Sequence, residues 1–419
     1  MRQLAGVLIP ILIICLFFLG DKLLFESLLA FFSDGKIFSW IYSGINWFTL
    51  LSFILPFLSF IRSRGFKGIL SLVALGFGIF LMKAIMAPLL WGNKILFGIT
   101  GSGLVFNIGL YTILGLSFLF FCWFVYGITF GKYNYKVSDV KIKIPNLPDA
   151  LVGYRIAQIT DVHSGSFDSK KGMQKGIKLV NDQKTDLIVF TGDLVNMRAN
   201  EIEPYFEDFS KLNAPDGIFS VLGNHDYYQF QWSSDMDQVK RNYNLYLEQH
   251  KNCGFELLLN EHVIIEKGGA KLALIGVENW GDPPFPQRGD LDVAMQNIIG
   301  TVKSSINNLP MNVMGNPMIV KDADAKILLS HDPSHWEKKV IDYPTKMDLT
   351  LSGHTHAMQF GFDVLGFKWS PVKYRYKHWW GLYEQAGRHL YVNRGFGFLG
   401  FPGRVGMWPE VSVFELTKG

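Results

Sequence analysis

Cysteine is scarce in this chain, which has only 3 among its 419 residues. Cys15 and Cys122 lie in apolar segments and Cys253 stands alone, so the sequence contains no disulfide framework. Paired cysteines of the kind that build closed structural zinc sites are also missing. This usage agrees with a reducing environment for the polar part of the chain that holds Cys253.

A strong charge of one sign is lacking too. The formal net charge is +4 and the pI is about 8.7, which is too mild to indicate a nucleic-acid partner, although it suits an anionic membrane surface. The sequence shows no internal repeat, low-complexity tract, P-loop or Ser-His-Asp arrangement. Repeat proteins, P-loop nucleotide hydrolases and serine hydrolases are therefore poor descriptions of it.

Long apolar runs are abundant, but nearly all of them lie before Gly131. About 20 helical residues cross a hydrocarbon core roughly 30 Å thick. Four segments are mostly long enough, namely residues 4–19, 37–61, 69–91 and 104–130. We predict an all-α transmembrane domain of about four spans over residues 1–131. The first segment could instead be a signal peptide, because Arg2 precedes it, but no small-residue cleavage site occurs before Asp21.

The charges near these segments predict an orientation. Arg2 and the basic residues within 62–67 and 132–136 fall on one side of the predicted spans, whereas Lys22, Lys36 and Lys94 fall on the other, close to acidic residues. By the positive-inside rule both termini, and the domain after residue 131, face the cytoplasm of a bacterial inner membrane.

Lys83 lies inside the third apolar segment. A charge buried there is costly and often functional. A lysine that snorkels toward one membrane face, or a span boundary that lies several residues away, has the same sequence pattern, and we favour this interpretation.

Five short motifs occur in a fixed order after residue 150, and each ends an apolar run that predicts a β-strand. The runs cover residues 154–160, 187–191, 218–222, 325–330 and 349–352. The motifs are Asp161-Val162-His163, Gly192-Asp193, Gly223-Asn224-His225-Asp226, His331 and Gly353-His354-Thr355-His356. Because ligands gather at the loops after strand ends in layered α/β domains, we expect these residues to meet in one pocket.

The side chains in these motifs are those that divalent metal ions prefer. They offer carboxylate oxygens, an amide oxygen and imidazole nitrogens, without thiolates. Two ions held roughly 3.5 to 4 Å apart need a bridging carboxylate to offset their repulsion. Asp193 is the best candidate, because the preceding glycine removes side-chain bulk beside the ions.

The ordered set resembles the calcineurin-like metallophosphoesterases, over about residue 140 to the C-terminus. The resemblance implies Asp161, His163, Asp193 and His356 around one ion, and Asp193, Asn224, His331 and His354 around the other. It implies that His225 acts at the leaving group and that Asp226 orients it. The implied reaction is in-line attack on phosphorus by a hydroxide held between two divalent ions, with Mn²⁺ favoured and Fe²⁺, Zn²⁺ or Mg²⁺ possible.

The same resemblance implies the fold class α/β (α+β). We expect a four-layer sandwich of two mixed β-sheets flanked by helices over residues 151–419, after a short linker and opening strand at 132–150. Residues 390–411 resemble the bacterial, membrane-associated YaeI- and YkuE-like branch. Arg394 and Arg404 in this segment, together with Asn224, are candidate substrate-binding residues. Either arginine could equally be a packing or surface residue.

Two further features leave alternatives open. Residues 367–380 interleave aromatic and basic side chains, which suits a lip at a membrane interface but also an ordinary hairpin with aromatic pairs. After Gly353-His354-Thr355-His356 many relatives continue with glycine, whereas Ala357-Met358-Gln359 follows here. Five histidines lie outside the motifs, and we interpret them as surface or packing residues: His250, His262, His335, His378 and His389.

We therefore predict a membrane-anchored, metal-dependent phosphoesterase that hydrolyses a phosphodiester or pyrophosphate, with a lipid-linked substrate favoured. One alternative is a phosphatase of soluble monoesters or phosphoproteins. Another, from a different class, is a membrane sensor or scaffold with a structural metal site. The expected partners are the lipid bilayer and the phosphoester, and not nucleic acid.

Overall fold

The computed structural model describes residues 2–29, 34–54, 67–227, 235–303 and 320–419. The chain forms two compact units. The first contains Met1–Phe130 together with Phe401–Val405, and the second contains Gly131–Gly400 and Gly406–Gly419. The predicted domain after residue 131 is therefore interrupted once, by a five-residue segment that clusters with the helices.

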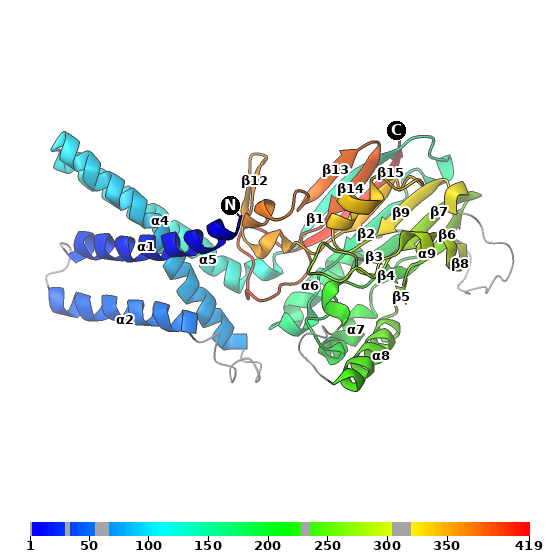
Figure 1. Cartoon of the computed structure of the whole chain (residues 1–419), viewed down its shortest axis with the longest axis horizontal. Coiled ribbons are helices and arrows are strands. Elements are labelled where there is room, and N and C mark those ends of the chain that lie inside the picture. Colours follow the sequence, from blue (N-terminus) through cyan, green and yellow to red (C-terminus); the bar gives the residue numbers. More distant parts are fainter. Residues whose placement is uncertain (1, 30–33, 55–66, 228–234, 304–319) are drawn as a thin grey trace. The chain divides into compact units, whose positions relative to one another are not determined.

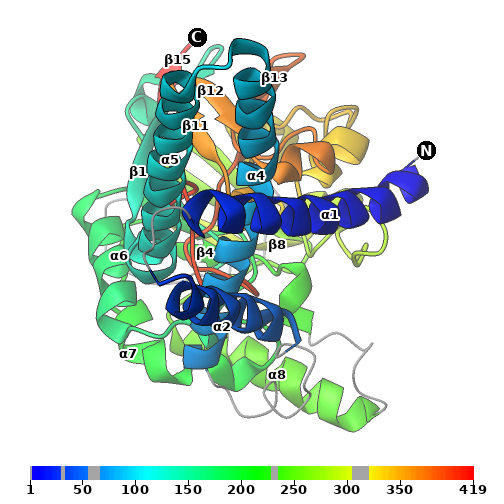
Figure 2. The same cartoon turned by 90° about the vertical axis from the view of Figure 1, so that its left-hand side faces the viewer.

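Four long helices build the described part of the first unit: α1 (Arg2–Leu29), α2 (Gly35–Ile54), α4 (Lys67–Thr100) and α5 (Gly103–Thr129). Helix α4 packs against the other three (Figures 1 and 2). Leu70–Thr100 and Gly103–Thr129 are long and apolar enough to cross a membrane, and α5 exposes large side chains such as Leu104, Phe118 and Leu119. The side chains of residues 2–13 and the predicted span residues 55–61 lie outside the described part, so the prediction of four spans stays a prediction.

Lys83 is not a snorkelling lysine, so the interpretation that we favoured is wrong. Its side chain is only 2% exposed, and its ammonium lies 2.6 Å from Asp21 Oδ1 of α1. Lys83 also donates a hydrogen bond to Asn46 of α2, and Tyr42 donates to the same Asp21 oxygen at 2.8 Å. The lysine thus joins three helices, because a charge buried among apolar helices needs a partner.

The second unit contains two mixed sheets. One has the strand order β1-β15-β2-β3-β4-β5 and the other β13-β14-β10-β9-β7-β6-β8. The first sheet consists of β1 (Lys136–Ile144), β2 (Arg155–Ile159), β3 (Leu187–Phe190), β4 (Ile218–Ser220), β5 (Glu256–Leu257) and β15 (Glu410–Lys418). The second consists of β6 (Glu261–Lys267), β7 (Ala270–Gly276), β8 (Ile298–Lys303), β9 (Ala325–Leu329), β10 (Leu349–Ser352), β13 (Gly381–Gln385) and β14 (Arg388–Val392).

Three apolar clusters hold these layers together. Facing side chains such as Ile156 and Val189 from one sheet and Leu274 and Leu351 from the other form the central cluster. The outer face of the first sheet is covered by α6 (Lys170–Asp182) and α8 (Met236–Asn252), and that of the second by α9 (Leu291–Gln296) and the segment around Trp336. The result is the expected four-layer α/β sandwich.

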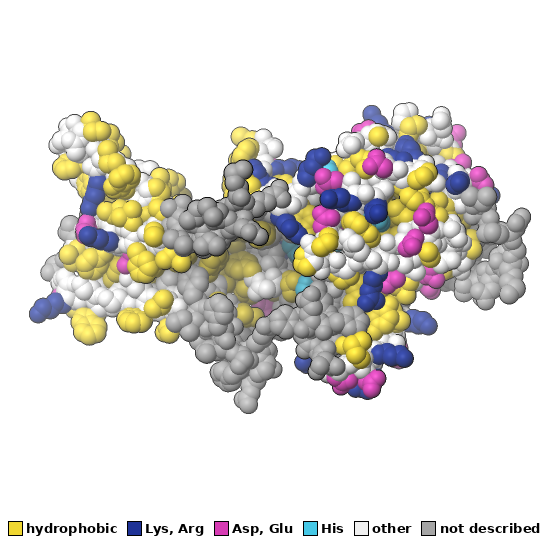
Figure 3. All heavy atoms as spheres, viewed as in Figure 1, with side chains coloured by type: hydrophobic (Ala, Val, Ile, Leu, Met, Phe, Trp, Pro, Cys, Tyr) yellow, Lys and Arg dark blue, Asp and Glu magenta, His cyan; other side chains and the backbone are white. Residues whose placement is uncertain are grey.

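The two units differ in surface chemistry. Apolar side chains cover the described helices of the first unit, with few charges, whereas lysine, arginine, aspartate and glutamate are interspersed over the second (Figure 3). Strands β2, β3 and β4 run parallel in one sheet, and β9, β10 and β14 run parallel in the other. Their carboxyl ends carry all the predicted motif residues.

Candidate metal centre

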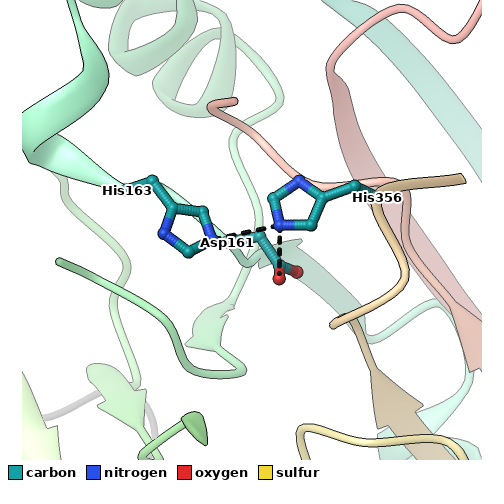
Figure 4. A group of neighbouring side chains, drawn as sticks. All are labelled: Asp161, His163 and His356. Atoms are coloured by element: carbon teal, nitrogen blue, oxygen red, sulfur yellow. Dashed lines mark hydrogen bonds and ion pairs between the residues drawn. The ribbon is translucent and has the colours of Figure 1, made fainter. Parts of the chain in front are cut away.

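Six of the seven predicted metal-binding residues form two clusters. Asp161, His163 and His356 make the first, and Asp193, His331 and His354 make the second. Within each cluster, the atoms that could bind a metal lie within 4.8 Å of one another. Figure 4 shows the first cluster, in which the His356 Nε2 atom lies 3.0 Å from His163 Nε2 and 3.2 Å from Asp161 Oδ1.

Asp193, a member of the second cluster, also faces the first. Its Oδ2 atom is 3.6 Å from Nε2 of His163 and 3.2 Å from Nε2 of His331. A single oxygen that faces one histidine of each cluster occupies the position that a bridging carboxylate needs. The other oxygen, Oδ1, accepts a hydrogen bond from the His225 backbone N–H at 2.8 Å.

Asn224, the seventh predicted ligand, meets a separate test of fit. Its side chain is 2% exposed, and its Oδ1 atom has no hydrogen-bond partner among the described residues. A buried amide oxygen without a partner costs free energy unless something else coordinates it. Together with the carboxylates and imidazoles, this oxygen completes a donor set that suits divalent cations.

Two of the histidine rings are each oriented by a hydrogen bond to one ring nitrogen. His331 Nδ1 lies 2.7 Å from the Thr191 carbonyl oxygen, so Nδ1–H donates there and Nε2 faces Asp193 Oδ2. His354 Nε2 lies 2.7 Å from Tyr376 Oη and 3.4 Å from Asp332 Oδ2, which leaves its Nδ1 atom for an ion. Metal-binding histidines typically use their second nitrogen in this way.

Asp332 and Tyr376 were missed from the sequence. Asp332 directly follows a predicted ligand, so its carboxylate could have been suspected. Tyr376 carries no local signal, because it is 22 residues from His354.

The backbone around the ligands is strained. Asp161, His163, Asp193, His354 and His356 all have left-handed φ values, between 49° and 69°. Such conformations cost roughly 1 to 2 kcal/mol for each non-glycine residue and concentrate at functional sites. The left-handed run continues through Ala357, Met358 and Gln359, where we noted that many relatives have glycine.

Glycines allow the loops to approach one another. A Cβ atom on Gly353 would lie 2.2 Å from Asp161 Oδ2, and one on Gly223 would lie 2.2 Å from Asp193 Oδ1. Both glycines therefore leave room for the carboxylates.

Two buried carboxylates stay ionised in this pocket. Burial alone would raise the pKa values of Asp161 and Asp193, but the neighbouring histidines, chiefly His356 and His331 respectively, hold both pKa values below the usual range. Burial opposes protonation of His331, yet Asp193 and Asp161 raise its pKa to about 10. Negative charge at the base of the pocket is thus ready for a cation.

His225 and Asp226, the two residues expected to be catalytic, have different surroundings. The His225 ring packs edge-on to the His163 ring, with 5.0 Å between centroids, and its Nδ1–H donates to the Asn196 carbonyl oxygen at 2.8 Å. Nε2 of His225 therefore remains available beside the clusters.

Asp226 does not contact the His225 ring in the way that we expected. Its carboxylate accepts backbone N–H groups from Gly223 and Asp193, both at 2.8 Å, and from Leu194 at 2.9 Å and Val195 at 3.4 Å. Its hydrogen bonds join the loop that carries Asp193 to the loop that carries Asn224.

The two arginines expected to bind substrate are both buried. Arg394 is 6% exposed, and its Nε atom lies 2.8 Å from the Glu410 carboxylate oxygen Oε2. Its guanidinium also stacks over the Trp380 ring at 4.2 Å. Arg404 is fully buried in the segment that clusters with the helical unit. These surroundings favour the packing alternative, and substrate binding by either arginine stays a prediction.

The remaining histidines are packing residues, as expected, and none lies on the surface. His250, His262 and His335 are at most 1% exposed, and His378 and His389 are 7% and 8% exposed. His250 and His335 each hydrogen-bond a serine hydroxyl through Nδ1, at 2.9 and 2.8 Å.

Comparison with known proteins gives a consistent result. The profile of the calcineurin-like phosphoesterases matches residues 154–358. A transmembrane protein with metallophosphoesterase domain from Danio rerio is 27% identical over 70% of this chain and 60% of its own length. The uncharacterized metallophosphoesterase YkuE of Bacillus subtilis is 27% identical over 68% of this chain and 86% of its own length.

Solved structures are more distant. The phosphopantetheinyl hydrolase of Mycobacterium tuberculosis is 12% identical, with a TM-score of 0.30, over 53% of this chain and 90% of that protein. The sulfate thiohydrolase SoxB of Thermus thermophilus is 13% identical, with a TM-score of 0.36, over 65% of this chain and 58% of that protein. The chain spans about 60% of the length of the Danio rerio relative.

Proposed function

We propose that this chain, which carries a calcineurin-like metallophosphoesterase domain, is a metal-dependent phosphoester hydrolase. It cleaves a phosphodiester or pyrophosphate of a lipid-linked substrate at the cytoplasmic face of a bacterial inner membrane. The supporting observation is the pair of ligand clusters joined by Asp193, with the unpartnered Asn224 oxygen beside them. Two helices apolar enough to span a bilayer support the location.

We assign the ligands as follows. Asp161, His163, Asp193 and His356 hold one divalent ion, and Asp193, Asn224, His331 and His354 hold the other. When bound, such ions lower the pKa of water toward neutrality and neutralise charge on phosphoryl oxygens. Mn²⁺ is the favoured metal, and Fe²⁺, Zn²⁺ or Mg²⁺ also suit these donors.

The chain's own residues supply positioning and a proton. His225 holds its Nε2 atom toward the pocket because Nδ1–H is bound to the Asn196 carbonyl oxygen. Protonated Nε2 gives its proton to the departing oxygen, which typically contributes about 10² to 10⁴-fold in rate. Asp226 keeps the Asp193 and Asn224 loops in register.

The choice of a lipid-linked substrate rests on tethering. The segment between α5 and β1 is short, with only Phe130, the turn Gly131–Tyr133 and two further residues before Lys136. A site held so close in sequence to an apolar helix meets bilayer substrates at high local concentration, whereas it gains nothing for soluble ones. The alternative of soluble monoesters keeps the same ligands and treats the helices as an anchor only.

The deciding experiment compares substrates on the full chain in lipid nanodiscs with added Mn²⁺. A lipid pyrophosphate or diester embedded in the bilayer is assayed beside a soluble aryl phosphate monoester and an aryl diester. Asp193→Asn serves as the inactive control. We expect the highest kcat/KM for the embedded substrate, while a clear preference for the soluble monoester would refute the lipid proposal.

Hydrolysis of none of these esters, by a preparation that contains two metal ions per chain, would refute catalysis and favour the sensor or scaffold alternative. Metal content is measured on the same sample, so that an inactive preparation without metal is recognised and reloaded before assay.

A further inference from the structure

A small hairpin near the last metal-binding motif exposes its apolar tip. Strands β11 (Phe362–Val364) and β12 (Phe367–Trp369) pair only with each other, and they stand clear of the two large sheets (β12 in Figure 1). At the turn, Val364 is 58% exposed, Leu365 104% and Phe367 63%. Neighbouring large apolar side chains exposed to this extent indicate a surface that binds something apolar.

Basic residues accompany this tip. We define the lip as residues 362–380. It contains four exposed cations and one acidic residue, Asp363, and the cations are Lys368, Lys373, Arg375 and Lys377. Tyr374, another aromatic residue of the lip, is 76% exposed. Apolar tip, aromatic rings and flanking cations together match the layers of an anionic bilayer surface, from acyl chains through headgroups to phosphates.

The base of the lip, in contrast, is firmly packed. Val372, Trp379, Ala357 and Met407 form a buried cluster. Ser370 donates a hydrogen bond to the Ala357 carbonyl oxygen at 2.7 Å. The hairpin is therefore anchored at its base, and only its tip is exposed.

This base is hydrogen-bonded to the metal-binding loop at His354 and at Thr355. Thr355 Oγ1 donates to the Trp379 carbonyl oxygen at 2.7 Å, and Tyr376 Oη lies 2.7 Å from His354 Nε2. Lys368 of β12 lies over the Trp380 ring at 4.1 Å. The structure thus connects the lip to the ligand-bearing loop through an unbroken series of contacts.

We propose that the lip inserts its tip, Val364, Leu365 and Phe367, into an anionic lipid bilayer, and that its cations bind the lipid phosphates. The proposal deepens the proposed function, on which it rests, because it names the surface through which the metal centre meets the membrane. A second copy of this chain is a poorer partner, since a symmetric contact would bring two sets of lip cations together.

The direct test measures the depth of the tip. Leu365→Cys is made in a chain whose Cys15, Cys122 and Cys253 are replaced by alanine, and a nitroxide label is attached. The full chain is placed in nanodiscs of phosphatidylglycerol and phosphatidylcholine. Accessibility to oxygen and to a water-soluble nickel chelate is measured by electron paramagnetic resonance. The matched control is Val293→Cys on α9, which is 39% exposed in the same unit.

We expect the label at position 365 to collide more with oxygen and less with the nickel chelate than the label at 293. Equal nickel accessibility at both positions would overturn the proposal. Dipolar broadening between labels, which indicates a second copy, would overturn it, as would a strongly immobilised spectrum, which indicates that protein covers the tip.

A functional test separates this proposal from the proposed function. Leu365→Glu should lower kcat/KM for a bilayer-embedded substrate by about tenfold and leave the rate on a soluble aryl ester unchanged. Leu365→Phe, which keeps the tip apolar, should retain activity on both. If the unaltered chain prefers the soluble ester, the proposed function fails while the label still reports whether the lip inserts. If Leu365→Glu lowers both rates equally, the lip proposal fails.

Discussion

Asp226→Asn is the substitution that most directly tests how the two ligand loops are held. The carboxylate accepts four backbone N–H groups, two on each oxygen. An amide has one acceptor oxygen, so two of these N–H groups would face an NH₂ group instead. Hydrogen bonds to a charged acceptor are each worth about 1.5 to 3 kcal/mol, which gives a loss of about 3 to 6 kcal/mol. Because the bond from Val195 is long, at 3.4 Å, we expect about 3 kcal/mol.

We expect the substitution to lower metal affinity as well, because Asp226 holds the backbone N–H of Asp193. Substitution of groups that orient metal ligands typically lowers metal affinity about 10- to 100-fold. The assay is the Mn²⁺ concentration that gives half-maximal activity after chelator treatment. This concentration does not depend on what fraction of the sample is folded.

Asp216→Asn is the matched control. Asp216 is another buried carboxylate, 1% exposed, and among the described residues it accepts a hydrogen bond from a single donor, the Tyr154 hydroxyl at 2.7 Å. An amide oxygen can still accept that bond, so the Mn²⁺ requirement should not change. Asp226→Asn with an unaltered Mn²⁺ requirement would refute the positioning role that we assign.

Three further predictions concern the pocket and its support. His225→Asn should lower kcat about 10² to 10⁴-fold with both metal ions retained, whereas Asp193→Asn should lose metal. Plasma spectrometry measures the metal content of both variants. Equal metal loss in the two would contradict their separate roles. Burial lowers the pKa of His250 to about 3 from its ordinary 6.5. Between these two pH values the unfolded state binds one more proton than the folded state. The free energy of unfolding should therefore fall as the pH drops below about 6.5, by up to about 1.4 kcal/mol per pH unit. Thermal unfolding midpoints against pH should show a flatter acid slope for His250→Gln, and an unchanged slope would exclude His250 as a source. Gly353→Ala should reduce metal content, because its Cβ would lie 2.2 Å from Asp161 Oδ2, while Gly98→Ala, with nothing within 4 Å of the added carbon, should keep both ions.

The positions of the ligands could be predicted because they depend on local patterns. Each motif follows a short apolar run, and such a run predicts a strand from local sequence alone. The ordered motifs then identify loops that meet at the strand ends. The glycines at 223 and 353 carried part of the same information, since only a missing side chain allows these loops to approach so closely.

Features that depend on distant partners could not be predicted in this way. Lys83 is buried because Asp21 and Asn46, 62 and 37 residues away, meet it between helices. Arg394 points to Glu410, and Tyr376 supports His354 across a fold that sequence spacing does not reveal. The left-handed run from His356 to Gln359 is held by contacts such as Gln359 with Leu399, and the residue types there gave no sign of it.

The segment Phe401–Val405 has a consequence for how the protein is made. This segment clusters with the helices, where the Arg404 backbone N–H bonds the Gly127 carbonyl oxygen at 3.0 Å and Phe401 packs on Phe124. The helical unit is therefore incomplete during synthesis until about 270 further residues have left the ribosome, and its last piece arrives almost together with the final strand of the enzyme. Completion of the helical unit and completion of the second unit should then be a single late event, so that a chain interrupted before residue 401 yields neither unit in finished form.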